Sequence, residues 1–201
     1  FGLAEGWGLH RCVNWPIAEV QLERAKEFLE ENEDRPALMM LHLMDMHLPY
    51  TEPQGYRNLF AGKGPPDLPR DQFNRSEVLK AVRKGGEESK QYIRDRYDNN
   101  LRYIDDQLSA FLGDLGEDDV VAIFADHGEE FWDHGNFEHG HSFYDELIKV
   151  PFIVKAAGVP TGVHDDPISL LDLAPTMAKA AGIEMPGAEG WPLQELDQRD
   201  F

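Results

Sequence analysis

Residues 120–142 decide the fold, and they read VVAIFADHGEEFWDHGNFEHGHS. The segment from Val120 to Ala125 is apolar, of strand length and rich in β-branched side chains, which predicts a buried parallel strand. This apolar run stops at Asp126, His127 and Gly128. Because ligands of open α/β sheets bind just beyond the carboxyl ends of the strands, the sequence predicts a binding site here.

The side chains that follow this strand are of kinds that bind metal ions. Asp126 supplies carboxylate oxygens, and His127 supplies an imidazole nitrogen. Three further histidines follow within one loop, and they are His134, His139 and His141. The Asp-His-Gly motif also occurs in ordinary loops and is a weak signal alone. Its place at a strand end, beside so many histidines, favours a metal or anion site.

Composition restricts the partners of the protein. The chain has 201 residues, of which 41% are hydrophobic and 28% are charged, and its formal net charge is −19. These values predict one globular domain over residues 1–201 that binds neither nucleic acid nor an anionic membrane. An anionic substrate would need a local positive charge, which a bound divalent cation supplies most directly.

Two classes of protein are excluded by the pattern of residues. No apolar run approaches the ~20 residues that a membrane-spanning helix needs. Cys12 is the only cysteine, so no disulfide bond or cysteine-based zinc site can form within the chain. Since the chain begins with Phe1 and not with methionine, we expect the native N-terminus to lie upstream, and the sequence leaves the compartment and the oligomeric state open.

Hydrophobic periodicity predicts the remaining secondary structure. Helices are expected at residues 18–33, 76–84, 89–115 and 172–181. Gly85-Gly86 and Gly182 are expected to end two of them. Further strands are expected at 36–43 and 150–155, and a long loop at 51–75. Strands that alternate with helices predict an α/β domain with a mostly parallel sheet flanked by helices.

A second polar cluster follows the strand expected at residues 36–43. It reads MDMHLPY over residues 44–50. Pro49 restricts Leu48 to an extended conformation, and this fixes how His47 is presented. The sequence therefore places His47 at the carboxyl end of a second strand.

These motifs together resemble the carboxyl-terminal portion of a sulfatase, within the alkaline phosphatase superfamily. The resemblance extends over residues 36–195 and implies an alkaline-phosphatase-like fold. The segments that carry it occur in the order of the family, and they are Asp45–Tyr50, Tyr97–Leu108, Ile123–Glu129, His139–Glu146 followed by Val150–Val154, and Asp172–Thr176 with Gly182-Ile183.

The resemblance implies a role for five side chains. Asp126 and His127 would be metal ligands. His47 would contact the ester oxygens or protonate the leaving group. His139 would lie where sulfatases place a sulfate-binding lysine or phosphatases a metal-binding histidine, and His141 competes for that role. The absence of a lysine at this position leaves phosphate esters open as substrates.

The resemblance also implies that the catalytic domain in this chain is incomplete. Sulfatases carry a formylglycine nucleophile made from a Cys/Ser-x-Pro-x-Arg motif, and an Asp pair for the metal. Neither feature occurs in this chain, and Cys12 in particular is not followed by Pro-x-Arg. We therefore expect the isolated chain to be an inactive fragment. The implied cofactor is a divalent ion, with Ca²⁺ or Mg²⁺ favoured and Mn²⁺ or Zn²⁺ possible.

Three functions are open at this point. The first is a sulfuric ester hydrolase that acts on a small-molecule or glycan ester. The second is a phosphate or phosphonate ester hydrolase, or a phosphoglycerol-type transferase, on the same fold. The third is a metal-binding relative without catalysis. The leaving group is not defined by the sequence.

Overall fold

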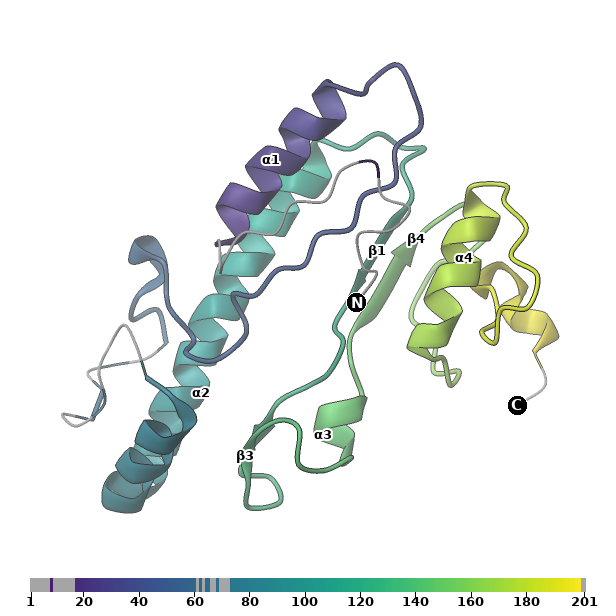
Figure 1. Ribbon diagram of the computed structural model, residues 1–201. Helices are drawn as coiled ribbons and strands as arrows, with labels where there is room; N and C mark the ends of the chain where they lie inside the picture. The colour runs from purple at the N-terminus through teal and green to yellow at the C-terminus, as the bar shows by residue number, and fades with distance from the viewer. Residues whose placement is uncertain are drawn as a thin grey trace. The chain divides into compact units, whose positions relative to one another are not determined.

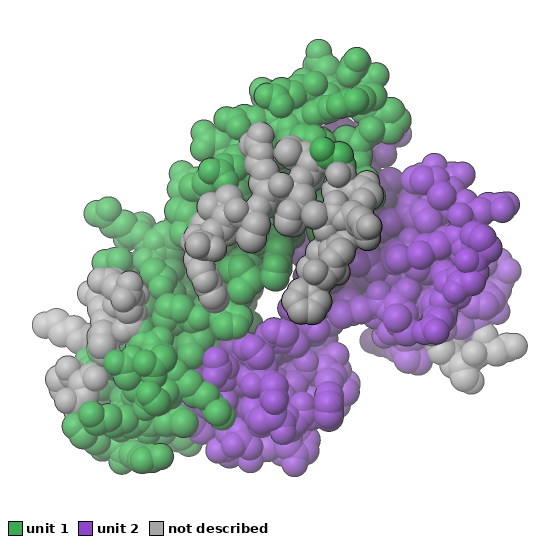
Figure 2. Space-filling view, viewed as in Figure 1, with its two compact units in different colours: residues 1–114 green, residues 115–201 purple. Residues whose placement is uncertain are grey.

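The computed structural model describes residues 17–60 and 73–199, together with residues 8, 62, 64, 65 and 68. The chain divides into two compact units, Phe1–Asp114 and Leu115–Phe201 (Figure 2). Cys12 lies outside the described residues, as does part of the loop expected at 51–75. Among the described residues, no helix combines the length and apolarity that crossing a membrane requires.

Two helices that pack along each other form the frame of the first unit (Figure 1). Helix α1 spans Ala18–Glu30 and helix α2 spans Arg75–Gly113. The side chains of α1 that are buried lie at helical spacing, and they are Ala18, Leu22 and Ala25. This spacing confirms the helix that the sequence predicts from residue 18.

Helix α2 is interrupted where the sequence predicts a break. Its first turn is closed by a capping box, in which Asn74 and Glu77 each bind the backbone N–H of the other. Gly86 has φ 57° and ψ −134°, outside the helical region. Glycine adopts such a conformation without steric penalty, so the predicted helices at 76–84 and 89–115 are confirmed as two parts of one kinked element.

Helix α1 is capped by a side chain from a distant part of the sequence. Ile17 offers no capping side chain. The N–H of Ala18 donates to Asp45 Oδ1 at 3.1 Å, and the N–H of Glu19 donates to the Tyr103 hydroxyl at 2.9 Å. Burial raises the pKa of Asp45 and, as the main cause, raises the pKa of Tyr103 to about 12. The segment with His47 therefore begins at the N-terminus of α1.

A buried polar network attaches residues 50–60 to α2. Arg96 is 1% exposed, donates from Nη2 to the Tyr50 carbonyl at 2.7 Å, and holds Nε 3.4 Å from Glu52 Oε2. Asn99 donates to Glu52 and accepts from the N–H of Phe60 at 2.9 Å. A short 3₁₀ helix, η1, spans Gln54–Tyr56 within this segment. The segment that follows His47 is thus held by side chains of one helix.

The described residues of the second unit form two pairs of short strands. Strand β1, Val121–Phe124, pairs with β4, Phe152–Lys155. Strand β2, Glu130–Phe131, forms a hairpin with β3, Phe137–Glu138. Both pairings are antiparallel. The other elements of this unit are helix α3 (Asp145–Ile148), 3₁₀ helix η2 (Leu170–Asp172), helix α4 (Leu173–Ala180) and 3₁₀ helix η3 (Leu193–Gln198).

The expected parallel sheet is not confirmed by these strands. The run at 36–43 forms no strand in the described part of the chain, and Leu38 and Met40 are 67% and 64% exposed. An apolar run does not by itself determine whether another segment reaches its edge, or in which direction that segment runs. Here the partner of β1 is β4, so the predicted strand at 150–155 is confirmed while the parallel pairing is not.

The carboxyl-terminal region is organised around Asp172, which is 1% exposed. Its carboxylate accepts the N–H of Ser169 at 2.8 Å, the N–H of Trp191 at 2.7 Å and a guanidinium N–H of Arg199 at 2.8 Å. Helix α4 ends at Ala180, and Gly182, which follows the C-cap residue Ala181, has φ 70°, as predicted for the glycine after a helix. One carboxylate therefore joins the start of α4 to the end of the described chain.

Candidate active site

The hairpin after β1 returns the chain to the Asp-His-Gly motif. Its register places Phe131 opposite Phe137 and Glu130 opposite Glu138. One step further toward the open end places Glu129 opposite His139, and the imidazole Nδ1 of His139 lies 2.9 Å from Glu129 Oε1. Cross-strand neighbours of this kind are close enough to interact. The hairpin therefore delivers His139 to a defined position.

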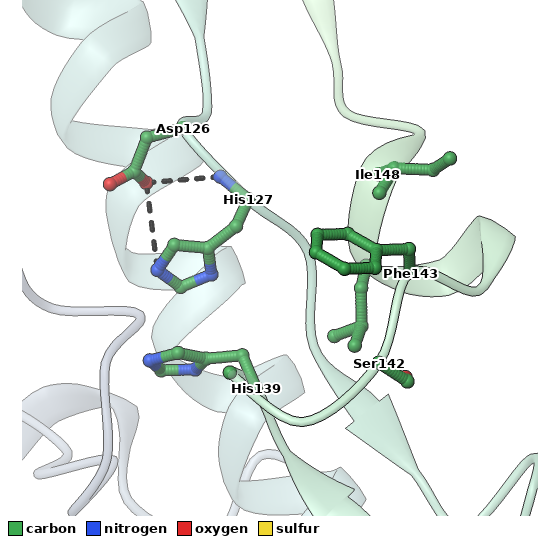
Figure 3. A pocket seen from close by; sticks show the side chains of 8 residues that line it. Asp126, His127, His139, Ser142, Phe143 and Ile148 are labelled. Carbon is green, nitrogen blue, oxygen red and sulfur yellow. Dashed lines mark hydrogen bonds and ion pairs between the residues drawn. The ribbon is translucent and has the colours of Figure 1, made fainter.

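Three of the predicted site residues meet in one pocket (Figure 3). The rings of His127 and His139 lie with centroids 3.9 Å apart and planes inclined by 32°. Asp126 lies beside His127, and its side chain is 71% exposed. The pocket has a volume of about 350 Å³, and it is lined by Asp126, His127, His139, Gly140, Ser142, Phe143, Leu147 and Ile148.

Asp126 and His127 have the geometry of two ligands of one ion. Asp126 Oδ1 lies 3.8 Å from His127 Nε2. Two atoms that are each ~2.1 Å from one metal are at most ~4.2 Å apart, so both can reach the same ion. His127 Nδ1 lies 2.9 Å from the Gly128 carbonyl, and metal-binding histidines commonly donate their second ring N–H to such a carbonyl. The pair fits a divalent cation.

This pair supplies only part of a ligand set. Among the residues that the structure describes, no three His, Cys, Asp or Glu side chains are grouped as an ion requires. Structural zinc takes four ligands and calcium six to eight. Asp126 and His127 would therefore supply at most half of the ligands of any of the predicted ions.

Gly128 is required by the approach of another part of the backbone. Its N–H donates to the Leu147 carbonyl at 2.8 Å. A Cβ atom at this position would lie 2.0 Å from the Glu146 carbonyl oxygen. The absence of a side chain thus allows the motif to contact α3.

The other two histidines of the loop are paired with carboxylates and do not line the pocket. His134 Nδ1 lies 2.6 Å from Glu146 Oε1, and its ring stacks on Tyr144. His141 Nε2 lies 2.6 Å from Glu130 Oε2. The geometry thus separates His139, which lines the pocket, from His141.

Glu130 is a residue of this region that sequence patterns did not single out. It is fully buried, although a charged residue beside a motif is usually solvated. No local pattern marks it, because its burial depends on hydrogen-bond donors from His134, Asn136 and His141 that folding brings together.

His47 lies in the first unit, in a turn of its own. Its N–H donates to the Met44 carbonyl at 3.0 Å, and its carbonyl accepts the N–H of Tyr50 at 3.1 Å. The ring Nδ1 lies 2.8 Å from the Leu48 carbonyl. The ring is therefore oriented by the backbone of its own segment.

Comparison with known proteins gives the family of the chain. The sulfatase family model matches residues 14–183. The uncharacterized sulfatase YidJ of Escherichia coli K12 is 27% identical over 176 residues, which cover 81% of this chain and 35% of that protein. A choline-sulfatase of Rhizobium meliloti is 29% identical over 110 residues, which cover 52% of this chain and 21% of that protein.

A solved structure shows the same fold. A 2-O GAG sulfatase superposes with a TM-score of 0.51 at 22% identity, over 87% of this chain and 39% of that one. The chain thus spans well under half the length of these relatives. Because the family model matches most of its residues, this chain belongs to the sulfatase family.

Proposed function

We propose that the protein containing this chain is a metal-dependent hydrolase of sulfate esters. The observation that carries the proposal is the meeting of Asp126, His127 and His139 in one pocket, in a chain of the sulfatase family. The sulfatase relatives support a sulfate ester as the substrate, either a small molecule or a glycan.

The chain's own residues would act on the charge of the ester. Asp126 Oδ1 and His127 Nε2 would hold a divalent ion, and the Gly128 carbonyl would orient the His127 ring. When bound, the ion supplies positive charge to the ester oxygens as negative charge builds up. A pair of one carboxylate oxygen and one imidazole nitrogen is compatible with Ca²⁺, Mg²⁺, Mn²⁺ or Zn²⁺, and oxygen-rich remaining ligands would favour Ca²⁺ or Mg²⁺.

His139 would contact an ester oxygen through a ring N–H. Glu129 orients this imidazole through the contact at Nδ1. The position of His139 in the pocket favours it over His141, which is engaged by Glu130. His47 would contact the ester oxygens or protonate the leaving group, as a histidine can near neutral pH.

Substitution of the metal ligand tests this function in the complete protein. Asp126→Asn should lower kcat/KM for 4-nitrophenyl sulfate by at least ~100-fold and weaken the binding of the divalent ion, because a ligand charge is lost. The matched control is Asp118→Asn, at an exposed position in the turn before β1, which should leave both unchanged. Equal activity and metal content in the two variants would contradict the proposal.

One observation favours phosphate esters as the second candidate. A histidine, His139, occupies the pocket where a sulfatase is expected to carry a lysine. The discriminating measurement compares 4-nitrophenyl phosphate with 4-nitrophenyl sulfate on the same preparation. A higher kcat/KM for the phosphate would move the assignment to phosphoryl transfer, and metal binding without turnover of either ester would indicate a non-catalytic relative.

A further inference from the structure

A buried carboxylate holds together the hairpin that carries His139. Glu130 lies on β2, immediately after Glu129, and is 0% exposed. The two neighbouring carboxylates have different partners. Glu129 Oε1 lies 2.9 Å from His139 Nδ1, whereas Glu130 Oε2 lies 2.6 Å from His141 Nε2.

The two oxygens of Glu130 bind different parts of the hairpin. Oε1 accepts the backbone N–H of His134 at 3.1 Å and that of Asn136 at 2.7 Å. Oε2 lies 2.6 Å from Nε2 of His141. One carboxylate thus joins the turn before β3 to the segment after β3.

The charge of Glu130 determines the direction of its bond to His141. Burial alone would raise the pKa of Glu130, but the hydrogen bonds from His141, Asn136 and His134 outweigh burial, and the pKa lies below its ordinary value. An ionised carboxylate only accepts hydrogen bonds, so His141 Nε2 is the donor. Charge-assisted bonds of this kind are stronger than neutral ones.

The anchored residue is two positions from His139. Gly140 lies between the two histidines with φ 83°, and glycine permits more backbone conformations than any other residue. A fixed His141 therefore limits the freedom of the segment that presents His139. This segment supplies the His139 ring whose centroid lies 3.9 Å from that of His127.

We propose that Glu130 is a positioning residue, which holds His141 and thereby keeps His139 against His127. The arrangement of the three side chains can be tested without turnover, whereas its importance for catalysis rests on the proposed function. Glu130 acts through its neighbours and need not contact the substrate.

Nuclear magnetic resonance of the histidine-labelled chain tests the arrangement. In Glu130→Ala, the nuclear Overhauser effect between the His127 and His139 rings should be lost, while the amide signals of Thr176 and Leu193 remain in place. The control is Glu117→Ala, at an exposed position before β1, which should retain the ring contact. Retention of the contact in folded Glu130→Ala would overturn the proposal.

A second variant covers the case in which Glu130→Ala does not fold. Glu130→Gln keeps the shape and an acceptor oxygen but removes the charge. The ring contact should weaken in this variant relative to Glu117→Gln, and an unchanged contact would equally overturn the proposal.

A double-mutant cycle in the complete protein tests the consequence for catalysis. If Glu130 acts through His139, the kcat/KM of Glu130→Gln/His139→Ala for 4-nitrophenyl sulfate should match that of His139→Ala within about twofold. Additive losses would show that Glu130 acts elsewhere. If His139→Ala alone loses no activity, the proposed catalytic role of His139 is wrong. The nuclear Overhauser effect between the His127 and His139 rings would then still test whether Glu130 positions His139.

Discussion

Asp45 caps helix α1 from 27 residues further along the chain, since its Oδ1 accepts the N–H of Ala18 at 3.1 Å. The first N–H groups of a helix have no partner within it, and Ile17 supplies none from its side chain. The same contact fixes the start of the segment that presents His47. A stabilising contact and the position of a candidate catalytic residue therefore depend on one carboxylate.

Loss of this cap should destabilise the first unit. Asp45→Ala is expected to cost about 1–2 kcal/mol in the free energy of unfolding, as for other helix caps. Asp45→Asn retains an acceptor oxygen and should cost less. Urea denaturation followed by circular dichroism measures both, with Asp34→Ala at an exposed position as the control. Equal stability of Asp45→Ala and the control would show that the cap contributes nothing.

Removing one partner of the buried ion pair between Arg96 of α2 and Glu52 should lower the free energy of unfolding more than removing both partners. Glu52→Ala removes the Glu52 carboxylate from the buried guanidinium of Arg96, and breaking a buried ion pair in this way typically costs about 3–5 kcal/mol. The double variant Glu52→Leu/Arg96→Met removes both charges and should cost less. Chemical denaturation of the three proteins gives the comparison, and a double variant that is the least stable of all would refute the argument.

Acid should weaken the carboxyl-terminal region through Asp172. Burial opposes the charge of Asp172, but bonds from Trp191, Ser169 and Arg199 outweigh it and place its pKa below the ordinary value. A carboxyl group with a lowered folded pKa contributes stability above its unfolded pKa of ~3.9 and loses it as the pH falls toward the folded pKa.

The corresponding variant is Asp172→Asn. It should be less stable than the natural chain by about 2–3 kcal/mol at pH 7, and the difference should narrow as the pH is lowered below ~4. Thermal unfolding between pH 7 and pH 3 measures this difference. If the difference in stability between the natural chain and Asp172→Asn stays constant from pH 7 to pH 3, Asp172 is not a source of the pH dependence.

A side chain at Gly128 should disrupt the candidate site. The Cβ atom of Gly128→Ala would meet the Glu146 carbonyl at 2.0 Å, so the motif and α3 must separate. We expect a loss of about 1–3 kcal/mol, as for other overpacked positions, and a weakened contact between the His127 and His139 rings. Gly113→Ala is the matched control, because a Cβ there meets nothing within 4 Å. Equal stability of Gly128→Ala and Gly113→Ala would contradict the close approach of the Gly128 backbone to the Glu146 carbonyl.

The sequence determined the features that depend on near neighbours. The helices follow from the spacing of residues such as Ala18, Leu22 and Ala25, and glycine conformations mark the kink at Gly86 and the end of α4 at Gly182. These elements are set by bonds and sterics within a few residues. The sequence also predicted that Asp126 and His127 lie together, because both residues directly follow one strand.

Tertiary structure decided the features that depend on distant partners. Strand β1 pairs with β4 in the antiparallel direction, Asp45 caps α1, and the hairpin register brings His139 to Glu129 and His127. None of these follows from local periodicity, because hydrophobicity indicates burial and not the identity of a partner. The inward carboxylate of Glu130 is the clearest case, since its charge is stable in the interior only where folding assembles its donors.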